Sequence, residues 1–368
     1  MKIAEACCYM PEYAGTFIAN MTALKDWIVA HNRGDEVIFI FPELDRTRSW
    51  CQELQKTCRV MFCHTRESNI INRTFYRICR DEQIDVLHLH FYDIRSAMLV
   101  KPLTRTKVIY HMHRSMPVMG MKRKILNRIK NAICMPTLDK VLCCSDGVLA
   151  SVLACGYPRK KCAVVTNRIN FSRFDKITDP DPFSSTAKAN NLIIFGSYFE
   201  IKGIDLALKA IEPIAAKYNI ILHIFSNWPE KTKSEVEGVM GKRCDWVHMH
   251  HTTEHIADYY SAATLFLTPS RTEGFCYANI EALYCGCPII KTNLPAMIYN
   301  IENEEEITFD GSIENLRERI EHFLTMPKEE LEGKLTQWRQ EAVDKYSIER
   351  WCEEIYDQYK NLTQTNAD

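Results

Sequence analysis

Short apolar runs alternate with amphipathic stretches along the whole chain. The runs are rich in β-branched and aromatic residues, as buried strands are, whereas residues 16–31 repeat apolar side chains at helical spacing. One face of that predicted helix holds Phe17, Met21, Leu24 and Ile28. Strands that alternate with helices predict βαβ units, and therefore an α/β fold with mostly parallel sheets.

The predicted strands form two sets, which indicates two doubly wound domains. They are residues 2–8, 36–41, 59–63, 85–90, 107–113, 140–144 and 163–166, and then 191–195, 220–225, 246–249 and 264–268. The polar stretch 176–190 lies between the sets and has no periodicity, which is typical of a linker. We therefore expect domains at 1–175 and 191–347 with a ligand cleft between them, and a C-terminal helix, 348–363, that packs back on the first domain.

Charge and cysteine usage narrow the function classes. The 46 Lys and Arg residues nearly balance the 47 Asp and Glu residues, so the overall charge gives no sign of a nucleic-acid partner. The 16 cysteines form no C-x-x-C pair, and no apolar segment has the length of a signal-sequence core or a membrane span. We expect a cytoplasmic protein with reduced thiols, either soluble or bound peripherally at the inner face of the membrane.

The most informative stretch is residues 270–288, SRTEGFCYANIEALYCGCP, which follows an apolar strand and opens a helix. Gly274 lets the backbone approach a ligand, and the N–H groups of Phe275, Cys276 and Tyr277 are expected among the unpaired donors of the helix start. Anions are favoured at such a place, so the stretch predicts a phosphate site.

Two glutamates border this helix start. Glu273 and Glu281 could accept hydrogen bonds from a hexose and from a ribose, or each could be an ordinary helix carboxylate. The helix between them rises roughly 12 Å, beyond the separation of about 5 to 9.5 Å found between glycosidase carboxylates. The pair therefore indicates sugar-nucleotide binding rather than hydrolysis.

Two further loops follow predicted strands. Lys202 lies before Gly203 in FGSYFEIKGID, where its ammonium group could neutralise a diphosphate or remain an ordinary surface cation. Gly15, in the loop after the first strand, would let the backbone approach a ligand in the cleft.

Two H-x-H pairs, His88/His90 and His111/His113, end two predicted strands. They could bind a metal ion, but no carboxylate or cysteine stands at ligand spacing, so we expect no metal. We expect His113 to lie in the cleft and bond a sugar hydroxyl, and His88 and His90 to be structural.

Residues 120–134, GMKRKILNRIKNAIC, predict a basic amphipathic helix. Its apolar residues either pack on the domain or contact an anionic membrane or a lipid diphosphate. The cations of this helix are Lys122, Arg123, Lys124, Arg128 and Lys130.

Together these segments resemble the retaining glycosyltransferases of the GT-B fold, specifically glycosyltransferase family 4. TPSRTEGFCYANIEALYCGCPII is similar to the family's Glu-x7-Glu donor motif and SYFEIKGIDLALKAI to its phosphate-lysine loop. DVLHLH, VIYHMHRS, VLCCSDGV and VVTNRINFSRFD resemble its N-terminal-domain landmarks, so the resemblance covers nearly the whole chain. It implies transfer of a hexosyl unit from a nucleoside diphosphate sugar to a glycan or lipid-linked acceptor, with retention, without metal or other cofactor, in cell-surface or exopolysaccharide biosynthesis.

The resemblance also implies residue roles. Glu281 would bind the ribose, Glu273 the donor sugar, and Lys202 the diphosphate, together with the amides of Gly274, Phe275 and Cys276. His113 would contact the sugar near the reacting carbon, and Gly15 would flank the diphosphate.

Two positions depart from the family pattern. Ser197 stands where an arginine is usual, and Asn167-Arg168 stands where Asn-Gly is usual. We hypothesise that Arg271 or Arg168 supplies the missing cation. Two alternatives stay open, a GT-B sugar-nucleotide epimerase and a non-catalytic GT-B partner subunit that binds sugar nucleotide.

Overall fold

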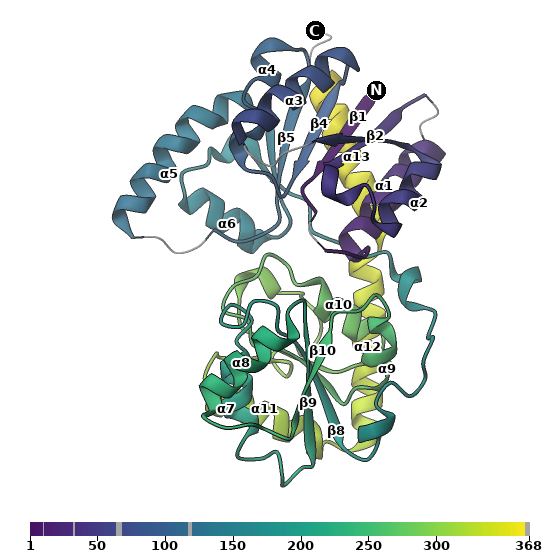
Figure 1. Ribbon diagram of the computed structural model, residues 1–368, viewed down its shortest axis with the longest axis vertical. Helices are drawn as coiled ribbons and strands as arrows, with labels where there is room; N and C mark the ends of the chain where they lie inside the picture. Colours follow the sequence, from purple (N-terminus) through teal and green to yellow (C-terminus); the bar gives the residue numbers. More distant parts are fainter. Residues whose placement is uncertain (10, 32–33, 64–67, 117–119, 365–368) are drawn as a thin grey trace. The chain divides into compact units, whose positions relative to one another are not determined.

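The structure is a computed structural model that describes residues 1–9, 11–31, 34–63, 68–116 and 120–364 (Figure 1). It divides into two compact units. The first contains Met1–Asn170 and the C-terminal segment from Ile348, and the second is Phe171–Ser347.

The first unit is built on a parallel sheet of seven strands among its described residues, in the order β3-β2-β1-β4-β5-β6-β7. All seven predicted strands are confirmed to within two residues at either end, because long apolar runs are the pattern that a parallel sheet covered on both faces requires. They are β1 (Lys2–Cys7), β2 (Glu36–Pro42), β3 (Arg59–Cys63), β4 (Val86–His90), β5 (Lys107–Met112), β6 (Lys140–Cys143) and β7 (Cys162–Val164).

Helices connect these strands, and the last helix of the chain packs with them in the first unit. α1 (Thr16–His31) buries its predicted apolar face. α13 (Ile348–Gln364) packs in the same core, where Trp351, Ile355 and Tyr359 are fully buried. The other helices are α2 (Ser49–Thr57), α3 (Ser68–Asp81), α4 (Val100–Leu103), α5 (Met121–Cys134) and α6 (Asp146–Ala154).

The second unit has a parallel sheet in the order β10-β9-β8-β11-β12-β13. The sequence pattern predicted its first four strands but not the last two, which are only four and two residues long. The strands are β8 (Asn190–Phe195), β9 (Ile220–Ser226), β10 (Val247–His251), β11 (Leu265–Thr268), β12 (Ile289–Thr292) and β13 (Thr308–Phe309).

The helices of the second unit lie between and after these strands. The helix that we predicted over 203–218 ends at Ile211, because Pro213 has no backbone N–H with which to continue the helical hydrogen bonds. The helices are α7 (Ile204–Ile211), α8 (Pro229–Met240), α9 (Ile256–Ala262), α10 (Tyr277–Tyr284), α11 (Ile313–Thr325) and α12 (Lys328–Tyr346).

The stretch that we expected to be a linker, 176–190, is counted with the second unit. Phe183 is buried there, with its ring 4.4 Å from that of His223. Thr178 donates to the carboxylate of Asp258 from its backbone N–H at 2.8 Å and from its hydroxyl. These contacts hold the stretch against β9 and α9 of the second unit.

Each sheet reverses its winding at one point, between β1 and β4 in the first unit and between β8 and β11 in the second. The loops that leave such neighbouring strands diverge, so the carboxyl ends of the strands border a crevice where ligands bind in open α/β sheets. No described helix is both long and apolar enough to cross a membrane.

Candidate functional site

The structure brings Lys202 and Glu273 together at the reversal point of the second sheet. Lys202 follows β8, Glu273 follows β11, and these two strands are neighbours. Lys202 Nζ donates to Glu273 Oε1 at 2.7 Å, and the hydroxyl of Ser270 donates to the same oxygen at 2.7 Å. Two residues that the sequence singled out separately therefore form one charged pair.

Gly203 makes the approach of the two loops possible. It has a left-handed backbone (φ 67°), and a Cβ on it would lie 1.9 Å from the carbonyl oxygen of Pro269. The backbone N–H of Arg271 donates to the carbonyl oxygen of Ile201 at 2.8 Å beside this contact. Only glycine permits both the conformation and the distance.

Lys202 keeps its positive charge in this setting. Burial lowers the pKa of its ammonium group, but the charge and hydrogen bond of Glu273 outweigh burial, so the pKa lies above its ordinary value. The side chain is still 27% exposed, which leaves the ammonium within reach of an arriving anion.

The start of α10 is held from one side by Tyr299. Its hydroxyl lies 2.9 Å from the carbonyl oxygen of Phe275 and 3.2 Å from that of Cys276, and Asn279 Nδ2 donates to it at 3.0 Å. In a trans peptide the N–H points opposite to the C=O. The N–H groups of Cys276 and Tyr277 therefore point away from Tyr299, as donors at a helix start that favours anions.

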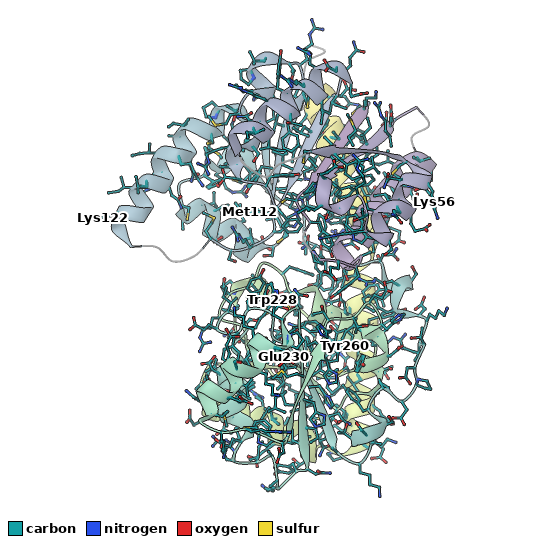
Figure 2. The ribbon with its side chains drawn as sticks, viewed as in Figure 1. Lys56, Met112, Lys122, Trp228, Glu230 and Tyr260 are labelled. Atoms are coloured by element: carbon teal, nitrogen blue, oxygen red, sulfur yellow. The ribbon has the colours of Figure 1, made fainter. Side chains whose placement is uncertain are left out.

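Glu281 is buried at 7% exposure, so it is not the solvated helix residue that one interpretation of the sequence allowed. The hydroxyl of Tyr260, labelled in Figure 2, lies 3.5 Å from Glu281 Oε2. Burial, and after it the charge of Glu281, raise the pKa of Tyr260 well above its ordinary value, so the phenol stays protonated beside the carboxylate.

The three polar residues linked to the departures from the family pattern all have protein partners. Ser197 Oγ accepts the N–H of Asn227 at 2.9 Å. Arg271 donates two hydrogen bonds to Asp205, both at 2.7 Å, and Arg168 donates two to Glu354 at 2.8 and 3.1 Å. Either guanidinium would have to exchange a bidentate carboxylate partner in order to bind phosphate.

In the first unit, His113 ends a chain of hydrogen bonds that starts at a buried carboxylate. Glu5 lies on β1, and its Oε2 is 3.0 Å from His90 Nε2, while His90 Nδ1 is 2.9 Å from His113 Nε2. An ionised Glu5 only accepts, so His90 donates from Nε2 and accepts at Nδ1. His113 then donates from Nε2, which leaves its Nδ1 as the acceptor.

A second branch leads from Glu5 through α13. The hydroxyl of Tyr359 donates to Glu5 Oε1 and lies 2.7 Å from His88 Nδ1, and His88 Nε2 lies 3.2 Å from His111 Nδ1. Burial raises the pKa of Glu5, but the neighbouring His88 and the hydrogen bonds from His88 and His90 outweigh it and lower the pKa. Glu5 is therefore ionised at the centre of both branches.

This cluster corrects one step of the sequence analysis, which found no carboxylate near the histidines. Glu5 was missed because the fold alone brings β1 beside β4. One ring nitrogen from each of His88, His90 and His111 lies within 4.8 Å of the other two, close enough to hold a metal ion. All of their hydrogen-bonding positions are used within the cluster except His111 Nε2, which has no partner among the described residues.

His113 lies at the carboxyl end of β5, next to two aromatic rings. Phe17 lies 5.2 Å and Phe91 4.5 Å from it, between ring centroids. Phe91 is 45% exposed and has a left-handed backbone (φ 62°), a strained arrangement that tends to occur at functional sites. Gly15, two residues before Phe17, donates its N–H to the hydroxyl of Tyr9 at 2.9 Å.

Lowering the pH from 7 to 5 is expected to destabilise the first unit. Burial, and after it the neighbouring imidazoles, lower the pKa of His90 to about 4 and the pKa values of His111 and His113 well below 6.5. In the unfolded chain each imidazole takes up a proton near pH 6.5, so the unfolded state binds more protons and stability falls as the pH drops. The loss should reach about 2 kcal/mol per imidazole at pH 5.

Urea unfolding at pH 7, 6 and 5 measures this slope. Glu5 does not contribute to it, because its lowered pKa affects stability only below the unfolded value of about 4.3. His111→Asn removes one titrating group and should flatten the slope. A free energy of unfolding that stays constant from pH 7 to 5 would contradict the prediction.

Comparisons with known proteins agree with this geometry. The family described as "Glycosyl transferases group 1" matches residues 175–342, and "Glycosyltransferase Family 4" matches residues 29–173. No curated protein matches the sequence.

Solved structures share the fold over nearly the whole chain. A glycosyltransferase from Rickettsia africae has a TM-score of 0.76 at 15% identity and covers 98% of both chains. HepE from Anabaena, in complex with UDP-glucose, has a TM-score of 0.76 at 12% identity and covers 98% of this chain and 100% of its own. Sucrose-phosphate synthase from Thermosynechococcus elongatus has a TM-score of 0.77 at 16% identity and covers 99% of both.

The two family matches together run through both units, and both sheets have the Rossmann-like winding that the solved structures share. The chain therefore belongs to the family 4 glycosyltransferases, enzymes with the two-domain GT-B fold.

Proposed function

We propose that the enzyme transfers a hexosyl unit from a nucleoside diphosphate sugar to a glycan or lipid-linked acceptor, with retention of configuration, in cell-surface or exopolysaccharide biosynthesis. The observation that carries this proposal is the Lys202–Glu273 pair beside the start of α10, at the reversal point of the second sheet. It supplies a cation, backbone donors and a carboxylate in one place. HepE, of similar fold, binds UDP-glucose, which supports a nucleotide sugar as the donor.

The diphosphate would be held by Lys202 and by the amides that open α10. When the glycosidic bond breaks, negative charge grows on the departing phosphate, and preorganised donors at that point stabilise the transition state. Lys202 would exchange Glu273 for phosphate, and Ser270 would keep one hydrogen bond to the carboxylate. Glu273 would then accept hydroxyl groups of the donor sugar, and Glu281 those of the ribose.

His113 and Gly15 are proposed to contact the same donor. The hydrogen bond to His90 leaves Nδ1 of His113 as an acceptor for a sugar hydroxyl. The lowered pKa of His113 keeps the imidazole neutral, so it adds no charge where positive charge grows on the sugar. The acceptor's proton would pass to a phosphate oxygen of the donor, and the reaction then needs no separate base and no metal ion.

We place this chemistry in the cytoplasm, at the inner face of the membrane. The cysteines of the chain, sixteen in all, are free thiols, which suits a reducing compartment.

The direct test is a thermal-shift screen of nucleoside diphosphates and their sugars, because a ligand that binds only the native state raises its melting temperature. The donor that raises the melting temperature is then incubated with the protein and with glycan and lipid-linked acceptors. NMR then determines the anomeric configuration of the product. Release of an epimerised donor would support the epimerase, and binding without turnover the non-catalytic subunit. An inverted product would overturn retention.

Glu273→Gln is expected to reduce turnover by about 10²-fold or more while nucleoside diphosphate binds as well as before, or more tightly. The amide loses the charge that faces the sugar, and it also frees Lys202 for phosphate. Steady-state kinetics and calorimetric titration separate the two effects. Glu200→Gln, at an exposed position of the neighbouring loop, is the matched control and should change neither.

A further inference from the structure

α5 carries a row of exposed aliphatic side chains. Ile125 is 52% exposed, Leu126 66%, Ile129 54% and Ile133 58%. At 100° per residue these four fall within an arc of about 100°, so they form one continuous stripe along the helix.

The opposite side of α5 faces the protein. Asn131 and Cys134 are buried there, and Asn131 Nδ2 donates to the carbonyl oxygen of Cys155 at 3.1 Å. The stripe therefore points outward, and the interpretation in which it packs on its own domain is wrong. Within the first unit α5 also extends outward from the sheet (Figure 1).

The charge of α5 has a single sign. Its sequence, MKRKILNRIKNAIC, holds five basic residues and no acidic one, although the whole chain is nearly neutral. Exposed Lys122 precedes the stripe at the outer end of the helix (Figure 2), and exposed Arg128 borders it. An apolar stripe flanked by cations matches the boundary between acyl chains and anionic headgroups.

We propose that the outer face of α5, formed by Ile125, Leu126, Ile129 and Ile133 with Lys122 and Arg128, binds the surface of an anionic lipid bilayer. The four aliphatic side chains enter the headgroup boundary, and the cations contact lipid phosphates. The surface does not depend on the donor chemistry. One consequence does rest on the proposed function, namely that binding to the bilayer would bring the enzyme to a lipid-linked acceptor there.

Other occupants fit this face less well. A symmetric contact with a second copy would bring two α5 helices together whose sequences hold basic residues and no acidic one, and like charges opposed across an interface cost affinity. A nucleic acid offers phosphates but no apolar phase for four aliphatic side chains. A bilayer with acidic lipids supplies both.

Flotation of the full chain with vesicles tests the proposal. Vesicles of 30% phosphatidylglycerol in phosphatidylcholine should carry the protein to the top of the gradient, and pure phosphatidylcholine should carry much less. Leu126→Glu with Ile129→Glu should lower the partition coefficient at least tenfold, because two inserting side chains become charged. Lys122→Ala and Arg128→Ala should each lower it about fivefold, and high salt should remove this difference.

Leu44→Glu, at another exposed leucine of the first unit, is the matched control and should float like the unchanged protein. Because all altered side chains are exposed, each variant should keep its melting temperature and its donor-induced thermal shift, which separates failure of this surface from failure of the proposed function. Equal flotation of the double variant and the unchanged protein would overturn the proposal. So would a dimer in solution that the double variant dissociates.

Discussion

Replacing Lys202 with methionine is expected to reduce kcat/KM by about 10²- to 10³-fold, the range seen when one preorganised donor to a developing anion is removed. The change has two costs here. The leaving phosphate loses its cation, and Glu273, which is only 12% exposed, is left as a carboxylate next to the site where the diphosphate binds. Calorimetric titration with nucleoside diphosphate and steady-state kinetics would measure the losses in binding and in turnover.

The paired charges allow a sharper form of this experiment. If Glu273 repels the diphosphate once Lys202 is gone, then Lys202→Met combined with Glu273→Gln should bind nucleotide better than Lys202→Met alone. Contacting residues show this kind of non-additivity, and distant ones do not. Lys209→Met, at an exposed position of α7, is the control and should leave kcat/KM unchanged. Additive losses in binding would show that Lys202 and Glu273 do not share the diphosphate site.

Gly203→Ala is expected to destabilise the second unit by about 2 to 5 kcal/mol and to weaken donor binding at the same time. The new methyl group would meet the carbonyl oxygen of Pro269 at 1.9 Å, so the β8–α7 and β11–α10 loops must separate. Overpacking costs about 1 to 3 kcal/mol, and a left-handed non-glycine residue adds about 1 kcal/mol or more. Chemical denaturation and nucleotide titration would measure the two losses.

The chain offers a matched control for the backbone part of this effect. Gly241, at the end of α8, has the same φ of 67°, but a Cβ on it would meet no atom within 4 Å. Gly241→Ala should therefore cost only about 1 kcal/mol and leave nucleotide binding intact. If the two variants lost the same stability, the close approach at Pro269 would not matter.

The sequence predicted the fold well wherever one local pattern decides a structure. Eleven strands were found because a buried parallel strand is a long apolar run, and α1 has the predicted bounds of residues 16–31 because its apolar spacing is regular. β12 and β13 were missed, since β12 has only two apolar residues, Ile289 and Ile290, before Lys291, and β13 is only two residues long. The pairing of Lys202 with Glu273 agrees with the chemistry expected of both segments, although nothing local could show that they touch.

Contacts over long sequence distances could not be predicted from one chain. Glu5 meets Tyr359 across 354 residues, and neither position has a local pattern that indicates the other. The only signal was a glutamate inside an apolar strand, KIAEAC, since a charge is rarely left inside a core without partners. The sequence also could not predict that the apolar side chains of α5 are exposed, because the same amphipathic pattern suits a packed helix and a membrane-bound one.

The hydroxyl of Tyr359 has a consequence for how this protein is made. During synthesis the strands of the first unit emerge long before α13, which follows the entire second unit in chain order. Until α13 arrives, Glu5 lacks one of its hydrogen-bond donors and its carboxylate is exposed to water or incompletely satisfied. Because every residue of the second unit precedes α13 in the chain, we expect the first unit, although translated earliest, to be completed last.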